Sequence, residues 1–162
     1  PGSIGELSSL VYLEVDHNGL TTLPERIGNL SSLYNLDLTN NYLTSLPDSI
    51  GDLSSLVFFE VDYNDLTSLP DSIGDLSSLR YLQLKDNQLT TLPESIGDLS
   101  SLYNLDLDNN DLTSLPNSIG NIDNLDVLML RDNQLCDDDF PWDWLTTFCS
   151  DISCNWNSQN CR

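Results

Sequence analysis

Residues 33–55 read LYNLDLTNNYLTSLPDSIGDLSS, and this 23-residue stretch decides the fold because it recurs along the chain at constant spacing. Its first part, LxxLxLxxN, occurs six times, starting at Leu10, Leu33, Leu56, Leu79, Leu102 and Leu125. Val15, Val61 and Phe59 replace leucines in two of the copies. A fixed period of this length is typical of repeat architectures, in which each repeat is one structural unit stacked on the next.

The LxL alternation predicts a short strand with Leu36 and Leu38 inward and with Asn35 and Asp37 outward. A single coil cannot bury all its aliphatic side chains, so successive coils must stack and cover each other. Strands from successive coils are then expected to pair in parallel and form one curved sheet.

The asparagine that ends each strand motif carries both hydrogen-bond donors and an acceptor, so it can satisfy turn backbone groups in a buried ladder. The six members are Asn18, Asn41, Asn64, Asn87, Asn110 and Asn133. In the return stretch, Pro47 is placed to start a short helical turn, with Asp48 near its positive end. Gly51 is expected to supply the permissive backbone that ends this turn.

The phrase LPDSIGDLSSL resembles the leucine-rich-repeat family, in particular its Ras-group-related class, and the resemblance covers residues 1–135. It implies an α/β repeat fold, a right-handed solenoid arc with a parallel sheet on the concave face and short helical or 3-10 turns on the convex face. In that family, partners usually bind the concave sheet. PGSIGELSSL at residues 1–10 matches the middle of a coil, so the first coil is read as truncated, with further repeats or a cap expected upstream.

Residues 136–162 depart from the period and contain all four cysteines, Cys136, Cys149, Cys154 and Cys161. An even number clustered at one end predicts a disulfide-stapled C-terminal cap in an oxidising compartment, with three pairings open. A zinc site is the alternative, but the segment has no CxxC pair. Pro141 is expected to open a short helix whose apolar side chains close the core, namely Trp142, Trp144, Leu145 and Phe148. Cysteine-rich flanks serve this purpose in the extracellular members that the chain resembles.

The strongly acidic composition limits the classes of partner that the chain is expected to bind. Asp and Glu number 26 against 5 Lys and Arg, a formal net charge of −21. Such a surface repels nucleic acid and anionic membranes and favours a basic or mixed-charge protein, a polyamine or metal cations. No apolar run is long enough for membrane insertion in this segment.

No catalytic motif or cofactor motif is present, so neither an enzyme nor a cofactor is expected. The acidic run from Asp106 begins like a calcium-binding loop. It lacks the required glycine, because Asp111 stands there, and the bidentate glutamate, because Asn117 stands there. Adventitious Ca²⁺ binding between acidic columns is therefore the most that we expect, with no dedicated metal site.

Outward strand positions vary while inward positions barely change, which indicates a recognition surface. These outward positions hold nine acidic residues and only two basic ones. They also hold four aromatic rings of the kind that anchor interfaces. The candidate ligand-binding residues are Tyr12, Glu14, Asp16, Asp37, Phe58, Glu60, Asp62, Tyr63, Tyr81, Lys85, Asp106, Asp108 and Arg131. We hypothesise a secreted or cell-surface recognition domain that binds a protein through this face, with an intracellular scaffold as one alternative. Asn29 begins the one N-glycosylation sequon.

A second alternative comes from a threonine placed beside another threonine or a serine in five successive coils. The members are Thr21, Thr44, Thr67, Thr90 and Thr113. Regular threonine arrays can match ice or a polysaccharide, which favours a structural cell-wall, adhesion or ice-contact protein. The competing interpretation is that the hydroxyls satisfy backbone groups of the turns.

Overall fold

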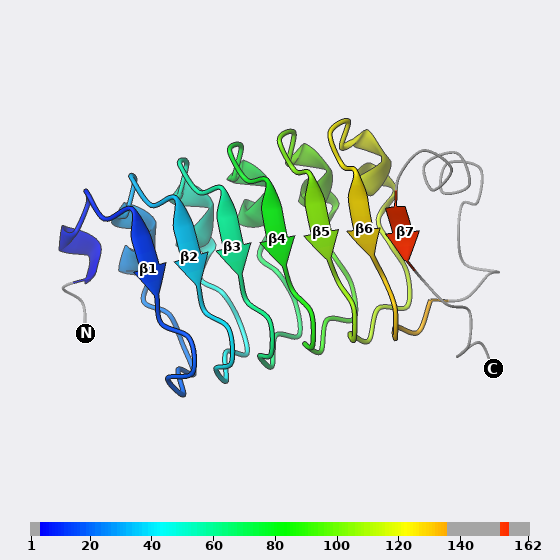
Figure 1. Cartoon of the computed structure of the whole chain (residues 1–162), viewed down its shortest axis with the longest axis horizontal. Helices are drawn as coiled ribbons and strands as arrows, with labels where there is room; N and C mark the ends of the chain where they lie inside the picture. Colours follow the sequence, from blue (N-terminus) through cyan, green and yellow to red (C-terminus); the bar gives the residue numbers. More distant parts are fainter. Residues whose placement is uncertain (1–3, 136–152, 156–162) are drawn as a thin grey trace.

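The protein is a single row of stacked coils, seen side-on in Figure 1 of the computed structural model, which describes residues 4–135 and 153–155. Seven strands form one parallel sheet in sequence order. They are β1 (Tyr12–Glu14), β2 (Asn35–Asp37), β3 (Phe58–Glu60), β4 (Tyr81–Gln83), β5 (Asn104–Asp106), β6 (Val127–Met129) and β7 (Ser153–Asn155).

The return side of the coils carries short 3-10 helices, which lie behind the sheet in Figure 1. They are η1 (Ile4–Glu6), η2 (Glu25–Asn29), η3 (Asp48–Asp52), η4 (Asp71–Asp75), η5 (Glu94–Asp98) and η6 (Asn117–Asn121). A proline in extended conformation precedes each of η2 to η6, as Pro47 does with φ −71° and ψ 152°. The predicted solenoid, with a parallel sheet and 3-10 turns, is confirmed.

The core lies between the sheet and the 3-10 helices and consists almost entirely of the repeated leucines and isoleucines. Leu36, Leu38, Leu43 and Ile50 are fully buried, and the same positions are buried in the following coils. Strand pairing keeps identical repeat positions opposite one another, for example Asn35 beside Phe58. Each repeat position therefore forms a straight column across the sheet.

The asparagine ladder connects each coil to the one before it. The Asn64 Oδ1 accepts a hydrogen bond from the Leu43 backbone N–H at 3.0 Å. Its Nδ2 donates to the carbonyl oxygens of Leu38 at 3.0 Å, Val61 at 3.1 Å and Asp62 at 3.2 Å. The predicted buried ladder is confirmed for five members, Asn41, Asn64, Asn87, Asn110 and Asn133.

Asn18 does not follow this pattern and is exposed. Its Nδ2 donates to the Asp16 carbonyl at 2.6 Å, and no strand precedes β1 in the described residues to offer the other partners. The prediction of a buried amide at this position is wrong for that reason.

Gly51 has a different role from the one that its sequence position suggests. It lies within η3 rather than after it, and Gly19 is the glycine with a left-handed backbone, at φ 68°. A Cβ on Gly51 would stand 2.4 Å from the Ser72 carbonyl oxygen of the next coil. Glycine is therefore required here by the close approach of stacked coils rather than by backbone freedom.

The strand β7 was not expected, since it lies outside the repeat. Its backbone pairs with β6, with Cys154 opposite Leu128, and extends the sheet by one strand. The predicted cap helix at Pro141 and the positions Cys136, Cys149 and Cys161 lie outside the described residues, so the disulfide-stapled cap stays a prediction.

Replacing Asn64 with alanine should test how much the ladder contributes to stability. The change leaves the buried Leu43 N–H without a partner and removes one of the two hydrogen bonds that each of three carbonyl groups accepts. We therefore expect a loss of about 2 to 4 kcal/mol in the free energy of unfolding. Asn18→Ala removes an exposed amide and should cost no more than about 0.5 kcal/mol. Urea denaturation of both variants makes the measurement, and equal losses would contradict the ladder's role.

Candidate binding face of the sheet

The open face of the sheet, opposite the core, carries the outward side chains of β1 to β6 in three adjacent columns. The in-register pairing places Tyr12, Asn35, Phe58, Tyr81 and Asn104 in the first column. The second column begins Glu14, Asp37, Glu60, Gln83, Asp106. The third column stands two residues after the end of each strand and contains Asp16, Asp62, Lys85, Asp108 and Arg131. The structure thus brings the predicted site residues to one face.

Five aromatic rings run in an unbroken row along this face, and we call them the aromatic ladder. Neighbouring ring centroids are 6.1 Å apart from Tyr12 to Tyr34, 5.5 Å to Phe58, 4.7 Å to Tyr81 and 6.0 Å to Tyr103. Phe58 and Tyr81 are stacked with only 4° between their planes. Their faces cover each other, so a partner would meet their edges.

Tyr34 and Tyr103 were missed by sequence reasoning, because each precedes its strand and the first column has an asparagine in that coil. Both are part-exposed, at 38% and 40%. The available signal was that each of the first five coils places one aromatic residue at either of two adjacent positions. Tyr63, by contrast, is not part of the ladder. It lies beyond the acidic columns, with the Lys85 Nζ 6.0 Å from its ring centroid.

The carboxylates of the second and third columns lie close to one another and are partly withdrawn from water. Burial raises the pKa of Glu60, and the neighbouring charges of Asp37 and Glu14 raise it further. Burial raises the pKa of Asp62 to about 6, although a hydrogen bond from the Lys85 backbone opposes the shift. The pKa of Asp106 is also raised, chiefly by burial. Burial, together with like charges on adjacent strands, therefore makes these carboxylates costly to keep ionised.

Several of the predicted acids have a structural role. The Oδ1 of Asp37 accepts from the Thr39 N–H at 2.9 Å, and that of Asp106 accepts from the Asp108 N–H at 2.9 Å. Two others bridge coils: Asp62 accepts from the Lys85 N–H at 2.8 Å and Asp108 from the Arg131 N–H at 2.7 Å.

Glu14 and Glu60 differ from these acids, since neither carboxylate has a hydrogen-bond partner within the described part of the chain. Asp16 contacts the neighbouring His17, whose Nδ1 lies 2.9 Å from its Oδ2. The two glutamates are therefore the carboxylates most available to a ligand.

The third column is followed by a row of residues in left-handed conformation, with φ between 54° and 55° in every coil. The row consists of His17, Asn40, Tyr63, Asp86, Asn109 and Asp132. Asn and Asp adopt this conformation at low cost, whereas a side chain such as Tyr63 is strained there. The two basic residues of the face stand just before this row. Lys85 Nζ lies 3.8 Å from the Asp86 carboxylate, and Arg131 is exposed.

Residues 4–135 and 153–155 contain no group of three or more His, Cys, Asp or Glu arranged to hold a metal ion. Ca²⁺ binding therefore has no formed site on the described acidic columns. Nor does any helix of that part of the chain have the length and apolarity to cross a membrane.

Two further predictions concern residues away from the open face. Asn29, the sequon residue, is exposed at the end of η2, and its glycosylation stays a prediction. The paired Thr and Ser side chains, such as Thr44 and Ser45, are exposed in every coil. Their hydroxyls make no hydrogen bond to any described residue, so the interpretation that they satisfy turn backbone groups is wrong.

Stacked coils, a parallel sheet with one open face and 3-10 returns define a solenoid repeat protein of the binding type. A family model described as a leucine-rich repeat region matches residues 2–80 and again residues 70–141. The chain belongs to the leucine-rich-repeat family. This family consists of non-enzymatic binding scaffolds in general, and nothing in the fold points to catalysis.

Solved structures agree with this assignment. A leucine-rich-repeat protein of Leptospira interrogans is 40% identical, with a TM-score of 0.81, over 83% of this chain and 34% of that protein. The ectodomain of the receptor kinase GASSHO1/SCHENGEN3 from Arabidopsis thaliana, in complex with CASPARIAN STRIP INTEGRITY FACTOR 2, is 34% identical with a TM-score of 0.82. That match covers 96% of this chain and 19% of the ectodomain.

An internalin from Listeria monocytogenes is 25% identical, with a TM-score of 0.70, over 98% of this chain and 51% of the internalin. This chain therefore spans from about a fifth to about half of these three proteins. Curated protein sequences give no significant match. The fold and its relatives indicate protein–protein interaction.

Asp62→Asn should raise stability near neutral pH. The pKa of Asp62 is about 6 in the folded chain against 3.8 ordinarily, so protonation stabilises the fold below pH 3.8 and this contribution is lost as the pH rises through 6. Asparagine keeps the oxygen that accepts from the Lys85 N–H and carries no charge. We expect the thermal midpoint to rise by about 2 to 4 °C near pH 7.5 and to match the parent at low pH.

The matched control is Asp75→Asn, a change at an exposed position. Its thermal midpoint should stay close to that of the parent throughout the pH range. An unchanged or lower midpoint for Asp62→Asn near pH 7.5 would show that the charge of Asp62 is not a burden to the fold.

Proposed function

We propose that this chain is an extracellular recognition module whose open sheet face binds a basic or mixed-charge protein segment. The observation that carries the proposal is the aromatic ladder lying directly beside a column of acidic side chains. The ladder supplies apolar anchors, and the acids supply complementary charge for Lys or Arg. Aromatic anchors flanked by charge are the usual composition of an interface that binds through a few strong contacts.

The dimensions of the ladder favour an extended segment. Its five coils span four inter-strand steps of about 4.8 Å, or roughly 19 Å. That length corresponds to about six residues of extended chain. Two of the structural relatives are plant receptors in complex with CASPARIAN STRIP INTEGRITY FACTOR 2 and with RGF2, respectively, the second named as a peptide hormone receptor. These complexes support a peptide or protein partner for this chain.

The extracellular location rests on the four clustered cysteines and on the receptor ectodomains among the relatives. Oxidised cysteines would be compatible with secretion, whereas four free thiols would favour the intracellular scaffold. A thiol count on the unreduced protein distinguishes these two locations.

Selection from a phage-displayed library of random peptides of about fifteen residues tests the face directly. We expect enriched peptides to carry Lys or Arg beside apolar residues and to bind more weakly as salt concentration rises. The double variant Glu14→Lys/Glu60→Lys should reduce their affinity at least about tenfold, since it reverses two charges that make no structural hydrogen bond. Asp62 is unsuitable for charge reversal because its carboxylate accepts a structural hydrogen bond from the Lys85 N–H.

The double variant Asp75→Lys/Asp98→Lys changes the net charge by the same amount on η4 and η5, away from the face. Selected peptides should bind it as they bind the parent, apart from the general effect of net charge. If both double variants lose affinity equally, only the net charge matters and the proposed face is wrong.

Contact with ice or an ordered polysaccharide is a second candidate function, favoured by the exposed hydroxyls of the Thr and Ser columns. These hydroxyls have no partner among the described residues, so they are available to bind water or sugar in a regular array. Thr44→Lys/Thr67→Lys would interrupt the array. If the array contacts ice, the parent should inhibit ice recrystallisation and the variant should lose that activity. An inactive parent would remove the ice-contact function from consideration.

A further inference from the structure

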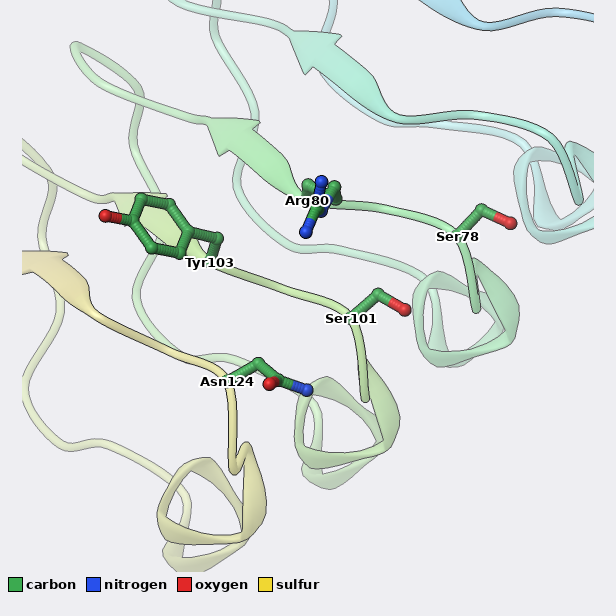
Figure 2. Close-up of a pocket in the computed structure, with 5 residues that line it drawn as sticks. All are labelled: Ser78, Arg80, Ser101, Tyr103 and Asn124. Carbon is green, nitrogen blue, oxygen red and sulfur yellow. The ribbon is translucent and has the colours of Figure 1, made fainter.

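A polar cavity lies beside the aromatic ladder, at the edge where the chain enters β4, β5 and β6 (Figure 2). It has a volume of about 420 Å³ and is lined by Ser78, Arg80, Ser101, Tyr103 and Asn124. None of the three acidic columns reaches it. Its lining is therefore distinct from the carboxylates that form the proposed peptide-binding face.

Three of the lining side chains use a donor to bond the preceding coil. The Ser78 Oγ donates to the Ser54 carbonyl at 2.7 Å, and the Ser101 Oγ donates to the Ser77 carbonyl at 2.7 Å. The Asn124 Nδ2 donates to the Ser100 carbonyl at 2.6 Å. A serine hydroxyl has one proton, so both serine oxygens can only accept further hydrogen bonds. The asparagine retains its carbonyl oxygen as an acceptor and its second N–H as a donor.

Arg80 supplies most of the donors. Its side chain is exposed, and its guanidinium group has no hydrogen bond or ion pair with any described residue. Tyr103 supplies an apolar surface, with a ring that is not stacked face to face on its neighbour Tyr81. Its hydroxyl donates to the Asp126 carboxylate at 2.8 Å, which holds the ring in place. Apart from Arg80, the lining side chains are thus held by hydrogen bonds before any ligand arrives, which lowers the entropic cost of binding.

This arrangement of donors and acceptors distinguishes between an anionic ligand and a neutral ligand rich in hydroxyl groups. A carboxylate or phosphate could accept from Arg80, but it would place its own acceptors against three oxygen acceptors and enter a chain of net charge −21. A pair of neighbouring hydroxyls can accept from the guanidinium and donate to the serine and asparagine oxygens. An apolar C–H face on the same molecule can pack on the Tyr103 ring. We propose that this cavity binds a pyranose ring of a neutral saccharide.

The repeat itself shows which residues are special to the cavity. One coil earlier, the Ser55 Oγ donates to the Ser31 carbonyl at 2.7 Å, so the row of serine acceptors is a general feature of the coils. Val57 occupies the repeat position of Arg80 there and offers no donor. This repeat position varies between coils, with Tyr34, Val57, Arg80 and Tyr103 in succession. An arginine followed by a tyrosine one coil later is what completes the site.

The test is an NMR titration of the isotopically labelled full chain with the methyl glycosides of glucose, galactose, mannose and xylose, each to about 50 mM, well above the millimolar Kd expected of a shallow site. The signals of the Arg80 Nε–H and the Asn124 amide should shift with at least one of them. Arg80→Val introduces the side chain found one coil earlier and should weaken binding about tenfold or more, since it removes a charged donor.

Ser101→Ala should weaken binding about two- to fivefold, whereas Ser55→Ala, the equivalent change outside the cavity, should leave it unchanged. Thermal melting of each variant establishes that it is folded. The proposal is overturned if none of the four glycosides shifts these signals, or if Arg80→Val binds like the parent. It is also overturned if glucuronate or inorganic phosphate binds more tightly than the neutral sugars, which would identify an anion site. None of these outcomes depends on whether the acidic columns bind a peptide.

Discussion

The hydrogen bonds of the asparagine ladder are the constraint on which the rest of the molecule depends. In each interior coil, a turn N–H such as that of Leu43 is satisfied by the amide of the next coil, here Asn64. A coil on its own would leave this group unpaired, so coils are stable only in contact and only in one register. The glycine of each 3-10 turn allows the approach that this register requires, because a Cβ on Gly51 would meet the next coil's backbone.

Fixed register also determines where recognition can take place. Identical positions line up in columns, so a change at one outward position alters one point of a continuous surface and leaves the core untouched. The acids on this surface divide into two groups. Asp62 and Asp108 each bond to the backbone of the following coil and belong partly to the scaffold. Glu14 and Glu60 are free of such bonds and, in the proposed function, carry the specificity of the face. The pKa values of Glu60 and Asp62 are raised chiefly by burial and further by the neighbouring negative charges, so keeping these carboxylates ionised costs the fold free energy.

Most of the fold could be predicted from the sequence, because a strict period states the register of every coil. The outward columns followed from strand alternation alone. The predictions that were wrong or missing concern contacts between residues that the repeat period does not specify. Tyr34 and Tyr103 belong to the aromatic ladder through their position in space, one residue before their strands. The structural bonds of Asp37 and Asp106 follow from the backbone beyond the strand, and the reason for Gly51 lies in the neighbouring coil. The strand β7 lies outside the repeat, where periodicity has no information.

The straight columns have an evolutionary consequence. Because every coil presents the same backbone to both neighbours, a unit such as residues 33–55 is a cassette that can be duplicated, deleted or exchanged by recombination without redesign of its surroundings. One added cassette would lengthen the aromatic ladder by a single step and bring its own ring and its own acid. The ring can stand at either of two adjacent positions, as it does at Tyr34 and Phe58, so the path of the ladder can shift sideways by one substitution. A binding surface built this way can change by single substitutions at outward positions, without any rearrangement of the backbone.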